Sequence, residues 1–202
     1  MAQSEGYLTF NCHANIRILY RQRFYLTLPK LIDSYKKASL STKGNFLLAL
    51  AHLIGGVPRN LLVADLPEVI PLLVESLKQP AMQEDANESG VIHEGNEEKL
   101  LLLSTLETVT DLTSSLNTTL CEHLHTFISR LLSIARSSKH MEVRRKSLLC
   151  IYHISRYPTI YVYPFKFTVI QGLAPCLDDP KRLVRREAVK ARCQWFLVGA
   201  PG

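Results

Sequence analysis

Two stretches of the sequence repeat each other, Met141-Glu-Val-Arg-Arg-Lys-Ser-Leu148 and Arg182-Leu-Val-Arg-Arg-Glu-Ala-Val189. They are separated by a shift of 41 residues. The same shift aligns three further pairs of small or apolar residues: Ile128 with Val169, Leu132 with Leu173 and Ala135 with Cys176. A period near 40 residues is typical of proteins that stack pairs of helices. The sequence therefore predicts two helices in each repeated unit.

Earlier units carry a weaker form of the repeat. Leu28-Pro29 matches Leu66-Pro67 at a shift of 38 residues, and apolar residues follow at helical spacing in both places. In the last predicted helix, small and apolar side chains form one stripe at i, i+4, i+7 and i+11: Val184, Ala188, Ala191 and Trp195. Further apolar residues lie beside this stripe, so a single helical hairpin cannot bury them all. We expect neighbouring hairpins to stack on one another.

The predicted fold is an all-α superhelix of the HEAT or ARM type with about four helical hairpins. The chain is interpreted as one domain, residues 1–202, whose repeats cover approximately residues 14–55, 60–114, 119–156 and 164–198. Residues 79–96 are polar and acidic and contain no Lys or Arg. We predict that they form a flexible loop between the two helices of the second repeat.

Bulk composition excludes several classes of protein. The chain is 47% hydrophobic and 21% charged, which fits a folded domain rather than a disordered one. Its longest apolar runs are much shorter than a membrane span, and its first residues lack the pattern of a signal peptide. The five cysteines form no C-x-x-C pair, which suits a reducing compartment. We therefore expect a soluble protein of the cytoplasm and nucleus.

Positive charge is concentrated in the second half of the chain. Residues 117–202 contain 14 basic and 5 acidic side chains, whereas residues 1–116 contain 10 basic and 13 acidic ones. Together the basic residues of the first, sixth and last predicted helices could form a ridge: Arg17, Arg21, Arg23, Arg144, Arg145, Lys146, Lys181, Arg182, Arg185, Arg186, Lys190 and Arg192. Three interpretations stay open, namely a solvated face, docking to an acidic protein surface, and contact with nucleic acid. No aromatic residues interleave with these charges for base stacking, which argues against the third.

No pattern in the sequence indicates catalysis. Cys121 and His125 would share a helix face, but no second pair of Cys or His stands at ligand spacing, so we expect an ordinary helix surface and no metal. Gly55-Gly56-Val-Pro58 is interpreted as a helix stop and a turn, because no G-K-[ST] follows it. We predict that the protein is not an enzyme and that it has no catalytic residues and no cofactor.

Several stretches resemble a known family. They are Asn15-Ile-Arg-Ile-Leu-Tyr-Arg-Gln-Arg-Phe24, Leu66-Pro-Glu-Val-Ile-Pro-Leu-Leu73, Leu177-Asp-Asp-Pro-Lys-Arg-Leu-Val-Arg-Arg-Glu-Ala-Val-Lys-Ala-Arg192 and Trp195-Phe-Leu-Val-Gly-Ala-Pro-Gly202. They resemble the C-terminal HEAT-repeat domain of the large scaffold subunit of the cytosolic iron-sulfur protein assembly (CIA) targeting complex, the MMS-sensitivity nucleotide excision repair family. The resemblance covers nearly the entire chain from Asn15.

The resemblance implies an adapter that carries no cluster itself. It implies binding to a small cluster-assembly subunit and a propeller-shaped subunit, and delivery of clusters to apoproteins of DNA repair and replication. By position, the residues expected to bind partners are Arg17, Arg21, Arg23, Arg182, Arg185, Arg186, Lys190 and Trp195. Trp195 has an alternative interpretation as a packing residue of the core. The alternative function is that of a HEAT-repeat adapter in nuclear transport or in a nucleic-acid-associated assembly.

Overall fold

The structure, a computed structural model, describes residues 10–55, 65–78, 91–114 and 118–200. Within these ranges all regular secondary structure is helical and no strand occurs, which confirms the predicted all-α class. Contacts divide the chain into two compact units, Met1–Asp65 and Leu66–Gly202.

The described part of the first unit is a helical hairpin. It consists of α1 (Phe10–Lys37) and α2 (Leu40–Gly55), which pack against each other. Phe24, Leu28 and Ile32 follow one another at intervals of four residues, so they lie on one face of α1, and all three are buried. Leu47 and Leu50 are buried on α2. The hairpin is therefore held by the helical apolar pattern that the sequence predicts.

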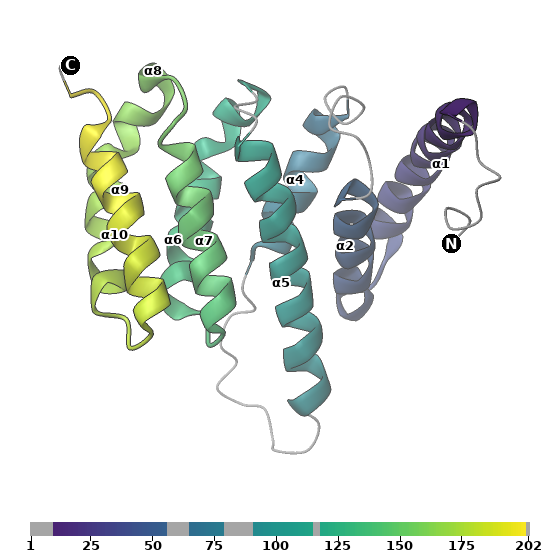
Figure 1. Cartoon of the computed structure of the whole chain (residues 1–202). Coiled ribbons are helices and arrows are strands. Elements are labelled where there is room, and N and C mark those ends of the chain that lie inside the picture. Colours follow the sequence, from purple (N-terminus) through teal and green to yellow (C-terminus); the bar gives the residue numbers. More distant parts are fainter. Residues whose placement is uncertain (1–9, 56–64, 79–90, 115–117, 201–202) are drawn as a thin grey trace. The chain divides into compact units, whose positions relative to one another are not determined.

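The second unit is a stack of hairpins in two layers (Figure 1). One layer contains α5 (Val91–Ser114), α7 (Met141–Ile154) and α10 (Arg182–Leu197), in which α7 packs against both of the others. The second layer contains α4 (Leu66–Ser76), α6 (Leu124–Ser137) and α9 (Lys166–Gly172). Short helical turns complete the connections: η2 (Thr118–His123), α8 (Thr159–Val162), η3 (Tyr163–Phe165) and η4 (Ala174–Asp178). In this unit each hairpin contacts its neighbour in the stack, as in a solenoid.

Two predicted boundaries differ from the structure. Helix α5 begins at Val91, so residues 91–96, which we expected in the acidic loop, are helical. The rest of that predicted loop, residues 79–90, lies outside the described residues. The first of the two helices expected in the repeat over residues 164–198 is divided into η3, α9 and η4, because Pro164 and Pro175 each stand at the start of a 3-10 turn. Proline lacks a backbone N–H and fixes φ, which favours the start of a new turn over continuation of a helix.

Small side chains bring the two layers close together, as the repeat predicts. Ser147 on α7 is fully buried, and its hydroxyl donates a hydrogen bond to the Leu131 carbonyl of α6 at 2.6 Å. Ala188 holds the equivalent position on α10 and is also fully buried. A larger side chain at either position would push the paired helices apart.

Candidate partner-docking site

The residues predicted to bind partners fall into two groups in different units. Arg23 is exposed on α1 in the first unit. Arg17 and Arg21 also belong to α1, but their side chains lie outside the described part of the chain. The other predicted residues all belong to α10 in the second unit. Only the α10 group can therefore be examined as one surface.

Three cations project from α10 into solvent. Arg182, Arg186 and Lys190 are exposed and follow one another at intervals of four residues, which places them along one side of the helix. Glu187 stands close to two of them, at 3.1 Å from Nη2 of Arg186 and 3.5 Å from Nζ of Lys190. One carboxylate for three cations leaves this side of α10 positively charged. It can attract an acidic partner surface.

Trp195 does not belong to this surface. Its side chain is fully buried, and its indole Nε1 donates a hydrogen bond to the Ile151 carbonyl of α7 at 3.0 Å. An indole held in this way offers no area to a partner. The structure therefore supports the alternative interpretation, in which Trp195 is a packing residue of the core.

Arg185 is half-buried and orders the turn ahead of its own helix. Its Nη1 donates to the carbonyls of Asp179 at 2.7 Å and Pro180 at 3.2 Å. These carbonyls belong to the turn between η4 and α10, so the guanidinium partly satisfies backbone groups that the turn leaves without helix partners. Arg185 thus has a local structural role in addition to the charge it presents.

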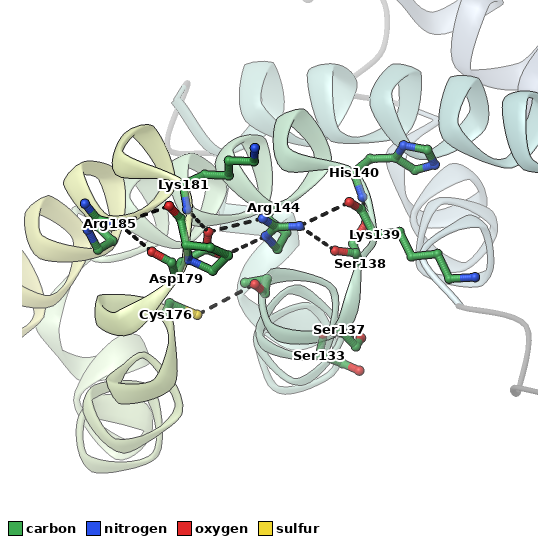
Figure 2. Close-up of polar contacts among 12 residues, drawn as sticks. Ser133, Ser137, Ser138, Lys139, His140, Arg144, Cys176, Asp179, Lys181 and Arg185 are labelled. Atoms are coloured by element: carbon green, nitrogen blue, oxygen red, sulfur yellow. Dashed lines mark hydrogen bonds and ion pairs between the residues drawn. The ribbon is translucent and has the colours of Figure 1, made fainter.

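The expected basic ridge loses two members, which is a correction to the sequence analysis. Arg144 is buried and forms an ion pair with Asp179, with Nε 2.8 Å from Oδ2 and Nη2 3.1 Å from Oδ1. Its Nη1 donates to the Ser138 and Lys139 carbonyls, as Figure 2 shows. Lys146 forms an ion pair with Glu107 of α5. The charge of Arg144 is therefore compensated inside the stack, and that of Lys146 is compensated by an exposed carboxylate, so the positive surface is centred on α10.

Exposed apolar side chains accompany the cations of the last hairpin. On α10 they are Leu183, Val189, Phe196 and Leu197, and on α8, η3 and α9 they are Ile160, Tyr161, Tyr163 and Phe167. The Arg192 guanidinium lies 5.1 Å from the centre of the Phe196 ring, and its Nε donates to the Ile170 carbonyl. A surface that mixes arginine with aromatic and aliphatic side chains is typical of the centre of a protein interface.

The described side chains do not converge on a metal-binding or nucleophilic centre. Within the described ranges, no group of three or more His, Cys, Asp or Glu lies close enough together to hold a metal ion. His125 instead packs against Phe165, with ring centres 6.0 Å apart. Burial raises the pKa of Cys150 to about 12 and also raises the pKa of Cys176, so both thiols are protonated core groups. Among the described helices, none combines the length and the apolar character needed to cross a membrane.

The stacked hairpins and the mixed basic and apolar face of α10 define a helical-repeat protein with a surface suited to binding. A family model described as the C-terminal domain of an RNAPII transcription regulator matches residues 1–155. The chain therefore belongs to the MMS19 C-terminal family, as the resemblance in the sequence indicates.

Curated relatives support this membership. The chain is 40% identical over 192 residues to the MMS19 nucleotide excision repair protein homolog of Xenopus tropicalis, an alignment that covers 95% of this chain and 17% of that protein. It is 35% identical over 203 residues to the protein of the same name in Homo sapiens, with 100% and 18% covered. It is 34% identical over 184 residues to the DNA repair/transcription protein mms19 of Schizosaccharomyces pombe, with 90% and 16% covered.

The chain thus spans less than a fifth of the length of these relatives. Their names and the family description refer to DNA repair and to the regulation of transcription. These descriptions point to a regulatory protein, and none of them names an enzymatic activity.

Proposed function

We propose that the chain is a protein-binding adapter module in cytosolic iron-sulfur protein assembly. In this role it binds the small cluster-assembly subunit and the propeller subunit of the CIA targeting complex. It thereby helps to bring clusters to apoproteins of DNA repair and replication, in the cytoplasm and in the nucleus. The family membership and the resemblance in the sequence support this proposal.

The observation that carries the proposal is the exposed face of α10. Arg182, Arg186 and Lys190 are exposed there, and exposed apolar side chains lie on the same helix. Such a face supplies electrostatic steering and apolar contact area, but no chemistry. An adapter needs only these, because it acts by raising the concentration of an apoprotein near the component that donates the cluster.

Reconstitution tests the proposal. The purified chain is mixed with each CIA subunit at about 150 mM salt, where long-range attraction between exposed charges is largely screened, and complexes are separated by size-exclusion chromatography. Charge reversal at Arg182→Glu and Arg186→Glu is expected to abolish the complex. The matched control carries Lys139→Glu and Arg145→Glu, which are exposed basic residues of the same unit and change the net charge equally.

Circular dichroism of each variant establishes that the helices survive. If the wild-type chain forms no complex with either subunit, the CIA assignment is wrong. If the α10 variant and the control bind equally well, the face of α10 is not the docking site.

Direct contact with nucleic acid is the second candidate, and the family description as a transcription regulator favours testing it. A salt titration with duplex DNA separates the two. Binding through phosphate neutralisation weakens steeply as salt rises, whereas sequence-specific binding persists near physiological salt. We expect weak, sequence-independent DNA binding that disappears near physiological salt.

A further inference from the structure

Arg144 and Arg185 occupy equivalent positions in successive repeats and make the same contacts to their own turns. Nη1 of Arg144 donates to the carbonyls of residues 138 and 139 at 2.8 and 3.3 Å. Nη1 of Arg185 donates to the carbonyls of residues 179 and 180 at 2.7 and 3.2 Å. All six positions are related by the 41-residue shift. The two guanidinium groups are therefore anchored in the same way.

The two arginines differ at the other edge of the guanidinium. Nε and Nη2 of Arg144 bind the two carboxylate oxygens of Asp179, which belongs to the turn of the following hairpin. For Arg185, the same two nitrogen atoms have no acceptor among the residues that the structure describes. Figure 2 shows Arg144 between the two turns, whereas Arg185 contacts only its own turn. Nε and Nη2 of Arg185 are thus two hydrogen-bond donors side by side, and the same two atoms of Arg144 bind the carboxylate of Asp179.

The apolar residues near the two arginines also differ: the one near Arg144 is covered, and the one near Arg185 is exposed. On α7, Arg144 and the Ile151 carbonyl both face α10, because Asp179 and Trp195 contact them. Leu148 lies between these two residues on the same side of α7 and is 0% exposed. Its equivalent on α10, Val189, is 50% exposed. Helix α10 therefore covers Leu148 on α7, whereas the equivalent residue on α10, Val189, has no helix over it among the described residues.

A second pair of equivalent repeat positions shows the same difference in exposure between α7 and α10. Ser155 at the end of α7 is 7% exposed, whereas its equivalent, Phe196, is 49% exposed. The described residues after α10 turn toward the other layer, since Lys166 Nζ donates to the Val198 carbonyl. Gly199 follows with φ of 69°, and a Cβ added to it would lie 2.8 Å from the Tyr163 ring. These residues therefore lie against η3 and α9.

We infer that Arg185, Val189 and Phe196 form a docking surface for a helix of a partner protein that carries an aspartate or glutamate in the turn ahead of that helix. The template for the partner is the protein's own α10, which meets α7 with Asp179 three residues before its first residue. The charges agree with an acidic partner, because Arg182, Arg186 and Arg192 surround the surface on the same helix. This inference rests on the proposed adapter function and names the chemistry of its partner.

Two substitutions test the surface, with the purified small cluster-assembly subunit and propeller subunit as probes. Arg185→Gln removes the charge of the donor pair, and Val189→Glu places a carboxylate at the centre of the surface. Each is expected to weaken binding to at least one subunit by about tenfold or more, as loss of a charged hydrogen bond would. The control Lys139→Gln removes the charge of an exposed residue of the same unit that lies outside α10 and is expected to change the affinity less than about threefold.

A third variant locates the partner carboxylate. Arg185→Lys supplies an amine, which carbodiimide can couple to a carboxylate in direct contact. Mass spectrometry is expected to find this coupling at an Asp or Glu that precedes a helix of the bound subunit. Because Arg185→Gln can also loosen its own turn, thermal unfolding of each variant is measured. Val189 is exposed, so Val189→Glu tests the surface without loosening that turn.

The outcomes separate the inference from the proposed function. If the wild-type chain binds but both Arg185→Gln and Val189→Glu bind within about twofold of it, the inference is wrong and the adapter function stands. If the wild-type chain self-associates and Val189→Glu makes it monomeric, a second copy covers the surface and the inference is also wrong. If the wild-type chain binds neither subunit, the proposed function fails and the inference fails with it.

Discussion

Arg144 on α7 binds both carboxylate oxygens of Asp179, a residue 35 positions later in the turn that leads into α10. The two side chains are only 10% and 8% exposed, so the pair is an internal connection between successive hairpins rather than a surface ion pair. Asp179 also accepts a hydrogen bond from the backbone N–H of Lys181 at 2.8 Å. One carboxylate therefore fixes both the neighbouring repeat and the start of its own helix.

Breaking this pair from one side is expected to destabilise the second unit strongly. Arg144→Met leaves a buried carboxylate without its counter-ion, and Asp179→Ala leaves a buried guanidinium. Each should lower the free energy of unfolding by about 3 kcal/mol, as is typical when one partner of a buried ion pair is removed. Urea unfolding followed by circular dichroism measures the change.

The double variant Arg144→Met/Asp179→Ala is the control for that experiment. Because it leaves no unpaired buried charge, its loss should be clearly smaller than the sum of the two single losses. Additive losses, or a single loss below about 1 kcal/mol, would mean that water already solvates the pair.

The 41-residue repeat allowed much of the fold to be predicted, but it did not reveal which arginines are free. The sequence places Arg144 and Arg185 at the same repeat position, so both entered the expected basic ridge. Their environments differ because only Arg144 has a following hairpin against it in the described structure. A single sequence records the repeat position but not the neighbour that covers it.

Trp195 and α5 illustrate the same limit. The apolar stripe that contains Trp195 predicts inward packing, whereas the resemblance implies a docking role. The complete burial of the side chain and its hydrogen bond to Ile151 decide for packing. The start of α5 was placed six residues too late, because Glu94, Glu97 and Glu98 give this region the composition of a loop. A run of polar residues at the start of a long helix carries no apolar periodicity from which to predict that the helix begins there.

Replacement of Trp195 should separate its packing from its hydrogen bond. Trp195→Phe keeps an aromatic ring but leaves a gap and removes the bond to the Ile151 carbonyl, so we expect a loss of about 2 kcal/mol. Trp195→Ala should cost about 4 kcal/mol, because it leaves a large cavity between α7 and α10. Denaturant unfolding measures both.

Partner binding provides the control for Trp195. If the residue acts only through the core, Trp195→Phe should bind CIA subunits with wild-type affinity wherever the protein remains folded. A loss of binding without loss of stability would restore the docking role.

Thiol reactivity should follow burial. Cys193 is exposed, whereas burial raises the pKa of Cys150 to about 12 and raises the pKa of Cys176. With a pKa of about 12, about one Cys150 thiol in ten thousand is ionised at pH 8, and the thiolate is the reactive form. Iodoacetamide at pH 8 is therefore expected to label Cys193 in the native protein, and Cys150 and Cys176 only after denaturation. Peptide mass spectrometry assigns each label, and rapid native labelling of Cys150 would contradict the packing of α7 against α5.

Two glycine substitutions should have opposite effects on stability. Gly44 lies within α2 in a right-handed helical conformation, and an added Cβ would meet no heavy atom within 4 Å. Gly44→Ala should therefore stabilise the first unit by about 0.5–1 kcal/mol, because alanine loses less backbone entropy on folding.

Gly199 has φ of 69°, and an added Cβ would lie 2.8 Å from the Tyr163 ring. Gly199→Ala should destabilise the end of the second unit by about 1–2 kcal/mol, since both the backbone and the contact become strained. Hydrogen exchange resolves the two effects, because protection should rise in α2 for the first variant and fall around Val198 and η3 for the second. Equal and small effects at both positions would mean that the contact of Gly199 with Tyr163 does not persist in solution.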